Sequence, residues 1–250
     1  SVSEHLVDTF VFSYAEIGML IGAFLLPGVV LALPSGVVGR YASDRLIVTT
    51  GLMFLALGGV VAVIATNFNM FGLARIICGI GFVLTTIFVT KMVADWFEGK
   101  ELATAMSVTV MSWPFGIAMG QVGHVWLAAL FDWRAAFLAA SLYCFLSAVG
   151  VFSVYRAPTS KNEAPPRAQL GLPPNQLTLT LLSSLVWAFF NAGYIVYLSF
   201  GVSVLVNGGY EPTQAAATIS LASWVMLFSG AICGHISDRF KKPDAILYVC

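Results

Sequence analysis

The chain has 250 residues and no formal net charge, and it is 59% apolar and only 10% charged, with a mean hydropathy of +0.89. Soluble domains are about 45–50% apolar and about 25% charged, so this composition excludes an ordinary soluble protein and indicates a polytopic membrane protein. No basic tract interleaved with aromatic residues is present, so nucleic acid is not an expected partner.

Long apolar runs follow one another along the chain. Each has about the 20 residues that a helix needs to cross a hydrocarbon core roughly 30 Å thick, and helix is the structure that satisfies the backbone there. An eighth run begins near Ala245 and stops at Cys250. We therefore predict an all-α fold with seven complete helices: Glu16–Val38, Leu46–Ala65, Met70–Ala94, Leu102–Leu130, Ala135–Tyr155, Leu177–Val206 and Ala215–Ile236.

The first 15 residues are more polar than the runs that follow. They carry Glu4, His5 and Asp8, and they lack an initiating Met, a basic leader and a cleavage site. We expect them to form an extramembrane loop that follows a helix absent from this chain. On this interpretation the sequence is the middle of a longer protein.

The segment Arg156–Gln176 is the longest polar stretch. It holds five of the ten prolines together with Lys161, Glu163 and Arg167, which is typical of an extended linker. We predict an N-terminal helical bundle over residues 1–155, a cytoplasmic linker over 156–176 and the start of a C-terminal bundle over 177–250.

Basic residues predict the orientation. If the loop with Asp44 and Arg45 is cytoplasmic, ten of the twelve Lys and Arg residues lie inside, and Arg75 and Arg134 lie towards the outside. We expect a multi-pass protein of the cell (inner or plasma) membrane that works as a monomer in the lipid bilayer. The predicted helix ends also carry tryptophans expected to form an interfacial belt: Trp96, Trp126 and Trp133.

One sequence motif occurs twice in the chain. Ser35-Gly36 is followed after six residues by Ser43-Asp44-Arg45, and Ser229-Gly230 is followed after six residues by Ser237-Asp238-Arg239. Both copies close a long apolar run. The repeat indicates two related halves, each with an Asp-Arg pair where a helix leaves the membrane, which is typical of a transporter.

These loops resemble the signature of the major facilitator superfamily, G-x-x-x-D-R-x-G-R/K-R/K. The second copy matches at Gly234, Asp238, Arg239 and Lys242, whereas the first keeps Asp44-Arg45 and lacks the trailing bases. Three further stretches are similar to family patterns at the fourth, fifth and sixth helices: Arg75 to Gly81, Trp96 to Ala105, and Asp132 to Phe137. The resemblance implies two pseudo-symmetric helical bundles, of which this chain holds the second to ninth helices and is incomplete at both ends.

The resemblance also implies a cytoplasmic gate between the halves. It assigns to this gate Asp44, Arg45, Asp238, Arg239 and Lys242. The alternative is that these residues form solvated turns whose positive charges only set the topology.

Arg75 is the strongest candidate for substrate binding. A guanidinium inside a membrane helix is costly unless it faces a cavity or a partner, and the family resemblance places this Arg in or beside the central cavity, with a role in anion binding or proton coupling. The alternative is an Arg that extends to the outer interface.

The predicted seventh helix adds a polar and aromatic face. Trp187, Asn191 and Tyr194 are spaced i, i+4, i+7, and Tyr197 follows one turn later. We consider these four residues for substrate binding, with helix packing as the alternative. His124, in the fifth helix, is a candidate proton relay, with a place at the interface as the alternative.

Together these features predict a secondary active transporter of a small solute or ion that works by alternating access, as a proton-coupled symporter or a uniporter. Arg75 favours a small anion, as in the cyanate-transporter-like branch. Two alternatives stay open: an efflux antiporter, from whose signature Trp113-Pro114 departs, and a receptor or sensor on the same scaffold. No enzyme is expected because no nucleophile–base pair is evident. Neither a cofactor nor a metal is predicted, because the four cysteines lack ligand spacing.

Overall fold

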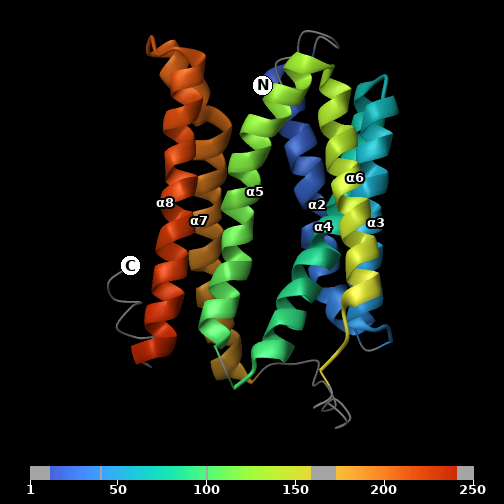
Figure 1. The fold of residues 1–250 in the computed structure, drawn as a ribbon, viewed down its shortest axis with the longest axis vertical. Helices are drawn as coiled ribbons and strands as arrows, with labels where there is room; N and C mark the ends of the chain where they lie inside the picture. The colour runs from blue at the N-terminus through green and yellow to red at the C-terminus, as the bar shows by residue number, and fades with distance from the viewer. Residues whose placement is uncertain (1–11, 40, 100, 159–172, 241–250) are drawn as a thin grey trace. The chain divides into compact units, whose positions relative to one another are not determined.

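The fold is known from a computed structural model that describes residues 12–39, 41–99, 101–158 and 173–240. Every complete apolar run forms a helix, and these residues contain no strand. The helices, labelled as in Figure 1, are α2 (Tyr14–Val38), α3 (Asp44–Ile64), α4 (Phe68–Phe97), α5 (Leu102–Leu130), α6 (Trp133–Val154), α7 (Pro174–Asn207) and α8 (Pro212–Phe240). The predicted all-α fold is therefore confirmed.

Within these residues, six helices are long and apolar enough to cross a membrane. In α8 the apolar stretch is shorter, Ala217–Gly230, so its passage through the membrane stays a prediction. The run near Ala245 and the polar residues Glu4, His5 and Asp8 lie outside the described residues.

Side-chain caps explain where several helices begin. Ser13 and Glu16 form a reciprocal capping box at α2, with Glu16 accepting from the Ser13 backbone N–H at 2.8 Å. Asn67 accepts from the backbone N–H of Met70 at 2.9 Å at the start of α4. These bonds satisfy backbone donors that the first turn leaves without a partner, so they set the helix starts more sharply than hydropathy does.

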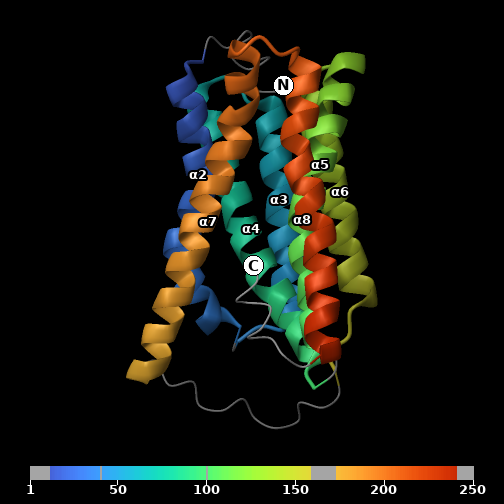
Figure 2. The same cartoon turned by 90° about the vertical axis from the view of Figure 1, so that its left-hand side faces the viewer.

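The chain divides by contacts into two units, which we describe separately. The first holds residues 1–158 and 230–250, and the second holds residues 159–229. Most of the predicted linker falls in 159–172, outside the described residues, so the predicted domain boundaries stay a prediction. In the first unit α3 packs against α4 and α6, and α2 packs on α4; Figures 1 and 2 show these helices side by side.

Glycines bring the helices of the first unit into backbone contact. A Cβ on Gly81 of α4 would meet the carbonyl oxygen of Gly51 and the amide nitrogen of Leu55, both on α3, the latter at 2.8 Å. A Cβ on Gly59 of α3 would clash with the hydroxyl of Ser141 on α6. Small residues at such crossings let membrane helices gain van der Waals contact along their backbones.

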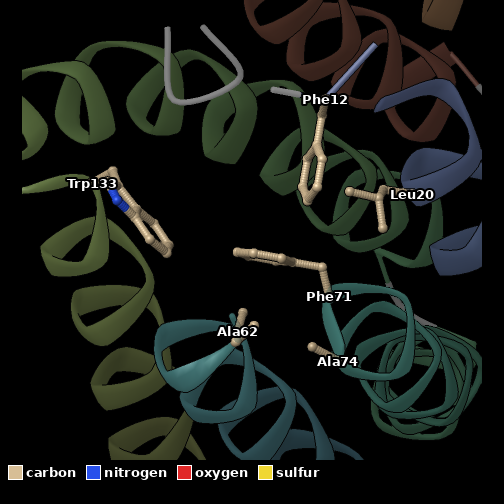
Figure 3. Packing of buried hydrophobic residues seen from close by; sticks show 7 residues of the cluster. Phe12, Leu20, Ala62, Phe71, Ala74 and Trp133 are labelled. Atoms are coloured by element: carbon tan, nitrogen blue, oxygen red, sulfur yellow. The ribbon is translucent and has the colours of Figure 1, made fainter. Parts of the chain in front are cut away.

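An aromatic cluster closes the end of this unit where α4 and α6 begin. The ring of Phe71 lies centrally, 5.8 Å from Trp133 and 6.0 Å from Phe12 between ring centroids (Figure 3). Trp133 is only 5% exposed, so its predicted place in an interfacial belt is wrong: its ring packs into the protein core. Trp96 and Trp126 are 47% and 62% exposed, as expected for that belt.

Candidate functional site

A cavity of about 340 Å³ lies among the helices of the first unit, and Arg75 lines it. Residues of α3, α4 and α6 form most of its wall, with one contribution from α2. The lining residues are Phe24, Leu55, Gly58, Gly59, Ala62, Ala74, Arg75, Cys78, Ala136, Phe137, Ala140, Ser141 and Cys144. The volume falls in the lower part of the roughly 300–1,000 Å³ range of small-molecule sites.

Among the described residues that line the cavity, Arg75 alone is charged. Its guanidinium carbon lies 5.7 Å from the centroid of the Phe137 ring, a cation–π contact with α6. No ion pair to Arg75 occurs within the described residues. An anion would be the complementary ligand for a guanidinium in such a mostly apolar wall.

Two other polar side chains of the wall are engaged in hydrogen bonds to backbone carbonyls. The Ser141 hydroxyl donates to the Phe137 carbonyl oxygen at 2.8 Å, and the Cys78 thiol donates to the Leu55 carbonyl oxygen at 3.7 Å. Sequence reasoning found Arg75 but missed Cys78 of α4 and Ser141 and Cys144 of α6, because each lies among apolar residues of its helix. Only the glycine pattern of α3 hints at this close packing.

The predicted face of α7 lies in the second unit. Trp187 stacks on Phe190, and Phe190 stacks on Tyr194, with ring centroids 5.9 and 6.1 Å apart. The Asn191 side chain donates to the Trp187 carbonyl oxygen at 2.9 Å. One stripe of α7 therefore carries three stacked rings, and the middle ring, Phe190, was not among the residues that the spacing predicted.

The two tyrosines of this face bond to α8. The Tyr194 hydroxyl lies 3.0 Å from the hydroxyl of Ser223, and the Tyr197 hydroxyl donates to the Ile219 carbonyl oxygen at 3.2 Å. These bonds favour the packing role for both tyrosines. Substrate binding by the α7 residues, and a site shared by them with Arg75, stay predictions.

The first predicted gate pair is held inside the first unit. Asp44 opens α3, and both of its carboxylate oxygens lie 2.5 Å from the Lys91 ammonium of α4. The guanidinium carbon of Arg45 lies 4.2 Å from the centroid of the Phe152 ring on α6. Sequence reasoning missed Lys91 as a partner because it is 47 residues away along the chain.

The second copy of the repeated motif has a different local structure. In the first copy α2 ends at Val38 and α3 begins at Asp44, whereas α8 continues through the second copy to Phe240. Arg239 is exposed in the last turn of α8. The side chains of Asp238 and His124 and the whole of Lys242 lie outside the described part, so the gate between the halves and the proton relay stay predictions.

The described helices and the Arg75 cavity define an all-helical polytopic membrane protein with one cation in a small-molecule cavity. The chain belongs to the Major Facilitator Superfamily, whose family model matches residues 1–250. It is 25% identical over 251 residues to the hexuronate transporter of Bacillus subtilis, covering 95% of this chain and 59% of that protein. It is 28% identical over 144 residues to the probable L-galactonate transporter of Escherichia coli, covering 58% of this chain and 32% of that protein.

The chain thus spans about three fifths and one third of the two curated relatives that it matches. The family and the relatives' names agree with the expectation that the protein is a transporter and not an enzyme. Neither name supports the cyanate-transporter-like branch, which stays a prediction.

Proposed function

We propose that the protein transports a small organic anion by alternating access, and that Arg75 binds the anionic group of the substrate. The observation that supports this proposal is that Arg75 lines a cavity of about 340 Å³, and that the described lining residues include no carboxylate. A charged side chain at the centre of a membrane helix costs about 2.5–3.5 kcal/mol, and a bound anion would offset whatever part of this cost Arg75 bears.

The names of the relatives support a carboxylate as the anionic group. Hexuronate and L-galactonate are both sugar acids, and a carboxylate matches the planar fork of a guanidinium in a bidentate pair. The proposed substrate class is therefore a small carboxylate, with sugar acids as the first compounds to test.

The positive charge of Arg75 also argues against the alternative that the protein is an efflux antiporter. An efflux antiporter for lipophilic cations needs a negative or neutral cavity, whereas Arg75 raises the electrostatic potential of this one. Coupling to protons as a symporter, or uniport without coupling, follows from the departure of the α5 stretch around Pro114 from the antiporter pattern.

The test is uptake of labelled glucuronate and galactonate into proteoliposomes that contain the full-length transporter, with and without an inward pH gradient. Arg75→Gln removes at least one charged hydrogen bond worth about 1.5–3 kcal/mol, so kcat/KM should fall by about 10- to 150-fold or more. Arg75→Lys keeps the charge without the bidentate fork and should fall in between. Arg134→Gln, which breaks an ion pair with Asp132 whose side chains are both 46% exposed, is the matched control and should transport normally.

Acceleration by the gradient would support symport, and gradient-independent uptake would support uniport. Full activity of Arg75→Gln would overturn the role of this side chain. Absence of anion flux beside export of lipophilic cations would overturn the proposed function, and absence of any flux would favour the receptor alternative.

A further inference from the structure

The cavity that holds Arg75 extends along the helices that enclose it. Its lining residues run from Ala136 to Cys144 on α6 and from Leu55 to Ala62 on α3. Each stretch covers about 10–12 Å of helix, at about 1.5 Å per residue. The cavity therefore has two ends, and the two ends differ in chemistry.

The end nearer the aromatic cluster carries the positive charge. A long side chain on a helix points back toward the start of that helix, and the Arg75 guanidinium accordingly contacts Phe137, close to the start of α6. The guanidinium is enclosed by protein, yet no hydrogen bond or ion pair to it occurs in the described part of the chain. An anion that binds Arg75 is therefore fixed at this end of the cavity.

The opposite end carries two thiols on facing walls. Cys144 lies seven residues beyond Phe137 on α6, and Cys78 lies one turn beyond Arg75 on α4. These spacings place each thiol on the same face of its helix as the residue that precedes it in the cavity. The far part of a ligand whose anionic group binds Arg75 thus approaches the thiols.

The two thiols differ in their surroundings. The Cys78 thiol donates to the Leu55 carbonyl oxygen at 3.7 Å, and its sulfur packs against Gly58, where an added Cβ would clash with it. No hydrogen bond of Cys144 occurs among the described residues, and this cysteine is partly exposed. Cys144 is therefore the thiol that is more available to a ligand in the cavity.

We propose that Cys144 is a modification site inside the anion cavity: small anionic thiol reagents are drawn to it by Arg75, and a carboxylate bound at Arg75 shields it. The shielding rests on the proposed function, whereas the preference for anionic reagents rests on the cavity and Arg75 alone. With a methanethiosulfonate, the Cys144 sulfur attacks the sulfenyl sulfur and forms a disulfide. Methanesulfinate leaves, and the thiol proton passes to water.

The test compares two reagents that differ in charge, sulfonatoethyl and trimethylammonioethyl methanethiosulfonate. They modify the full-length protein with Cys144 as its single cysteine and the others replaced by alanine, and intact mass measures both rates. Because both reagents react by the same step, the ratio of the anionic to the cationic rate cancels the intrinsic reactivity of the thiol. A protein that keeps only Cys233 is the matched control, since this partly exposed cysteine of α8 does not line the cavity.

We expect the ratio to be at least about tenfold higher at Cys144 than at Cys233, because a unit charge in the same cavity attracts one reagent and repels the other. Arg75→Gln should lower the Cys144 ratio by about tenfold or more, whereas Arg75→Lys, which keeps the charge, should preserve most of it. Arg134→Gln, outside the cavity, should leave the ratio unchanged.

Glucuronate at about ten times its Kd should slow the modification of Cys144 about tenfold, because it leaves about one cavity in eleven empty. Equal ratios at Cys144 and Cys233, a ratio that Arg75→Gln does not change, or no reaction of Cys144 while Cys233 reacts would each overturn the proposed modification site. Sugar-acid uptake would then still support the proposed function. A high ratio that depends on Arg75, without shielding by glucuronate or galactonate, would support the site and overturn only sugar acids as the substrate class.

If the single-cysteine protein does not fold, the protein with all its cysteines decides. After treatment with each reagent, peptide mass mapping measures the modification of Cys144 and Cys233 in the same molecule. The proposal requires the anionic reagent to be preferred at Cys144 and this preference to fall in Arg75→Gln. Equal preference at the two cysteines would overturn it.

Discussion

The contact between Gly59 and Ser141 gives a quantitative test of how α3 meets α6. A Cβ on Gly59 would clash with the Ser141 hydroxyl, while its next neighbours, the Ser141 Cβ and the Phe137 carbonyl oxygen, would lie at 3.3 and 3.4 Å. The hydroxyl is thus the single obstacle to an added methyl group. Gly59→Ala should force α3 away from α6 at a cost of about 1–3 kcal/mol, the usual range for overpacking.

Removing the obstacle should restore the fit. In the described part of the chain the Ser141 hydroxyl donates to the Phe137 carbonyl of its own helix, so Ser141→Ala should cost at most about 1 kcal/mol. In the double variant the new Cβ at position 59 meets only the Cβ of residue 141 and the Phe137 carbonyl oxygen, at 3.3 and 3.4 Å, which small shifts can accommodate. We expect it to recover about 1–2 kcal/mol relative to the sum of the single changes, a coupling typical of residues in contact.

Thermal unfolding of the full-length protein in detergent, followed by tryptophan fluorescence, measures these effects. At about 2–4 °C per kcal/mol for chains of 150–250 residues, Gly59→Ala should lower Tm by several degrees. Gly72→Ala is the matched control: no atom lies within 4 Å of its added Cβ, so Tm should stay or rise slightly. A Tm of Gly59→Ala equal to that of Gly72→Ala, or a double variant as unstable as Gly59→Ala, would refute this packing.

Three further predictions use the same unfolding assay. Gly81→Ala should destabilise the protein by more than Gly59→Ala does, above about 3 kcal/mol, because the added Cβ meets backbone atoms of Gly51 and Leu55 that no side-chain change can move. A smaller loss of stability would contradict the close contact between α3 and α4. Asn67→Ala should cost about 1 kcal/mol through loss of the cap of α4, and Asn67→Ser should restore most of it, whereas equal loss in both would argue against capping. Tyr194→Phe should cost about 1–2 kcal/mol because it leaves the Ser223 hydroxyl, whose residue is 1% exposed, without this hydrogen-bond partner. Adding Ser223→Ala should return part of that stability, and strictly additive effects of the two changes would exclude the bond between α7 and α8.

Hydropathy alone predicted the helices, because a bilayer demands about 20 apolar residues and a satisfied backbone from any span. It predicted less about how the helices meet. Trp133 stands at a helix end, as a belt residue would, but its ring fills the space beside Phe71, and only the tertiary packing distinguishes these two places. Hydropathy is a property of one segment, so it carries no information on which segments are neighbours.

For the candidate site, too, the sequence indicated single charged residues but not the neighbours that surround them. Arg75 stood out because a guanidinium within an apolar run is costly, but the helices that enclose it contribute apolar, hydroxyl and thiol groups that carry no such signal. Asp44 stood out through the repeated motif, yet its partner Lys91 looked like one of many cytoplasmic bases. A charge is visible in a sequence, whereas a pair of charges on two helices becomes visible only when the helices are placed together.

Arg75 and Lys91 both lie on α4. Arg75 lines the cavity, and Lys91 holds Asp44 about 24 Å further along the helix axis, at about 1.5 Å per residue. Between them, Gly79 and Gly81 keep α4 in backbone contact with α2 and α3. A helix so closely packed moves as a rigid body more readily than it bends. At its far end Lys91 contacts Asp95 on α4 itself and Asp44 on α3, so only a movement between α3 and α4 would strain the Asp44 contact, while the Asp95 contact would stay intact.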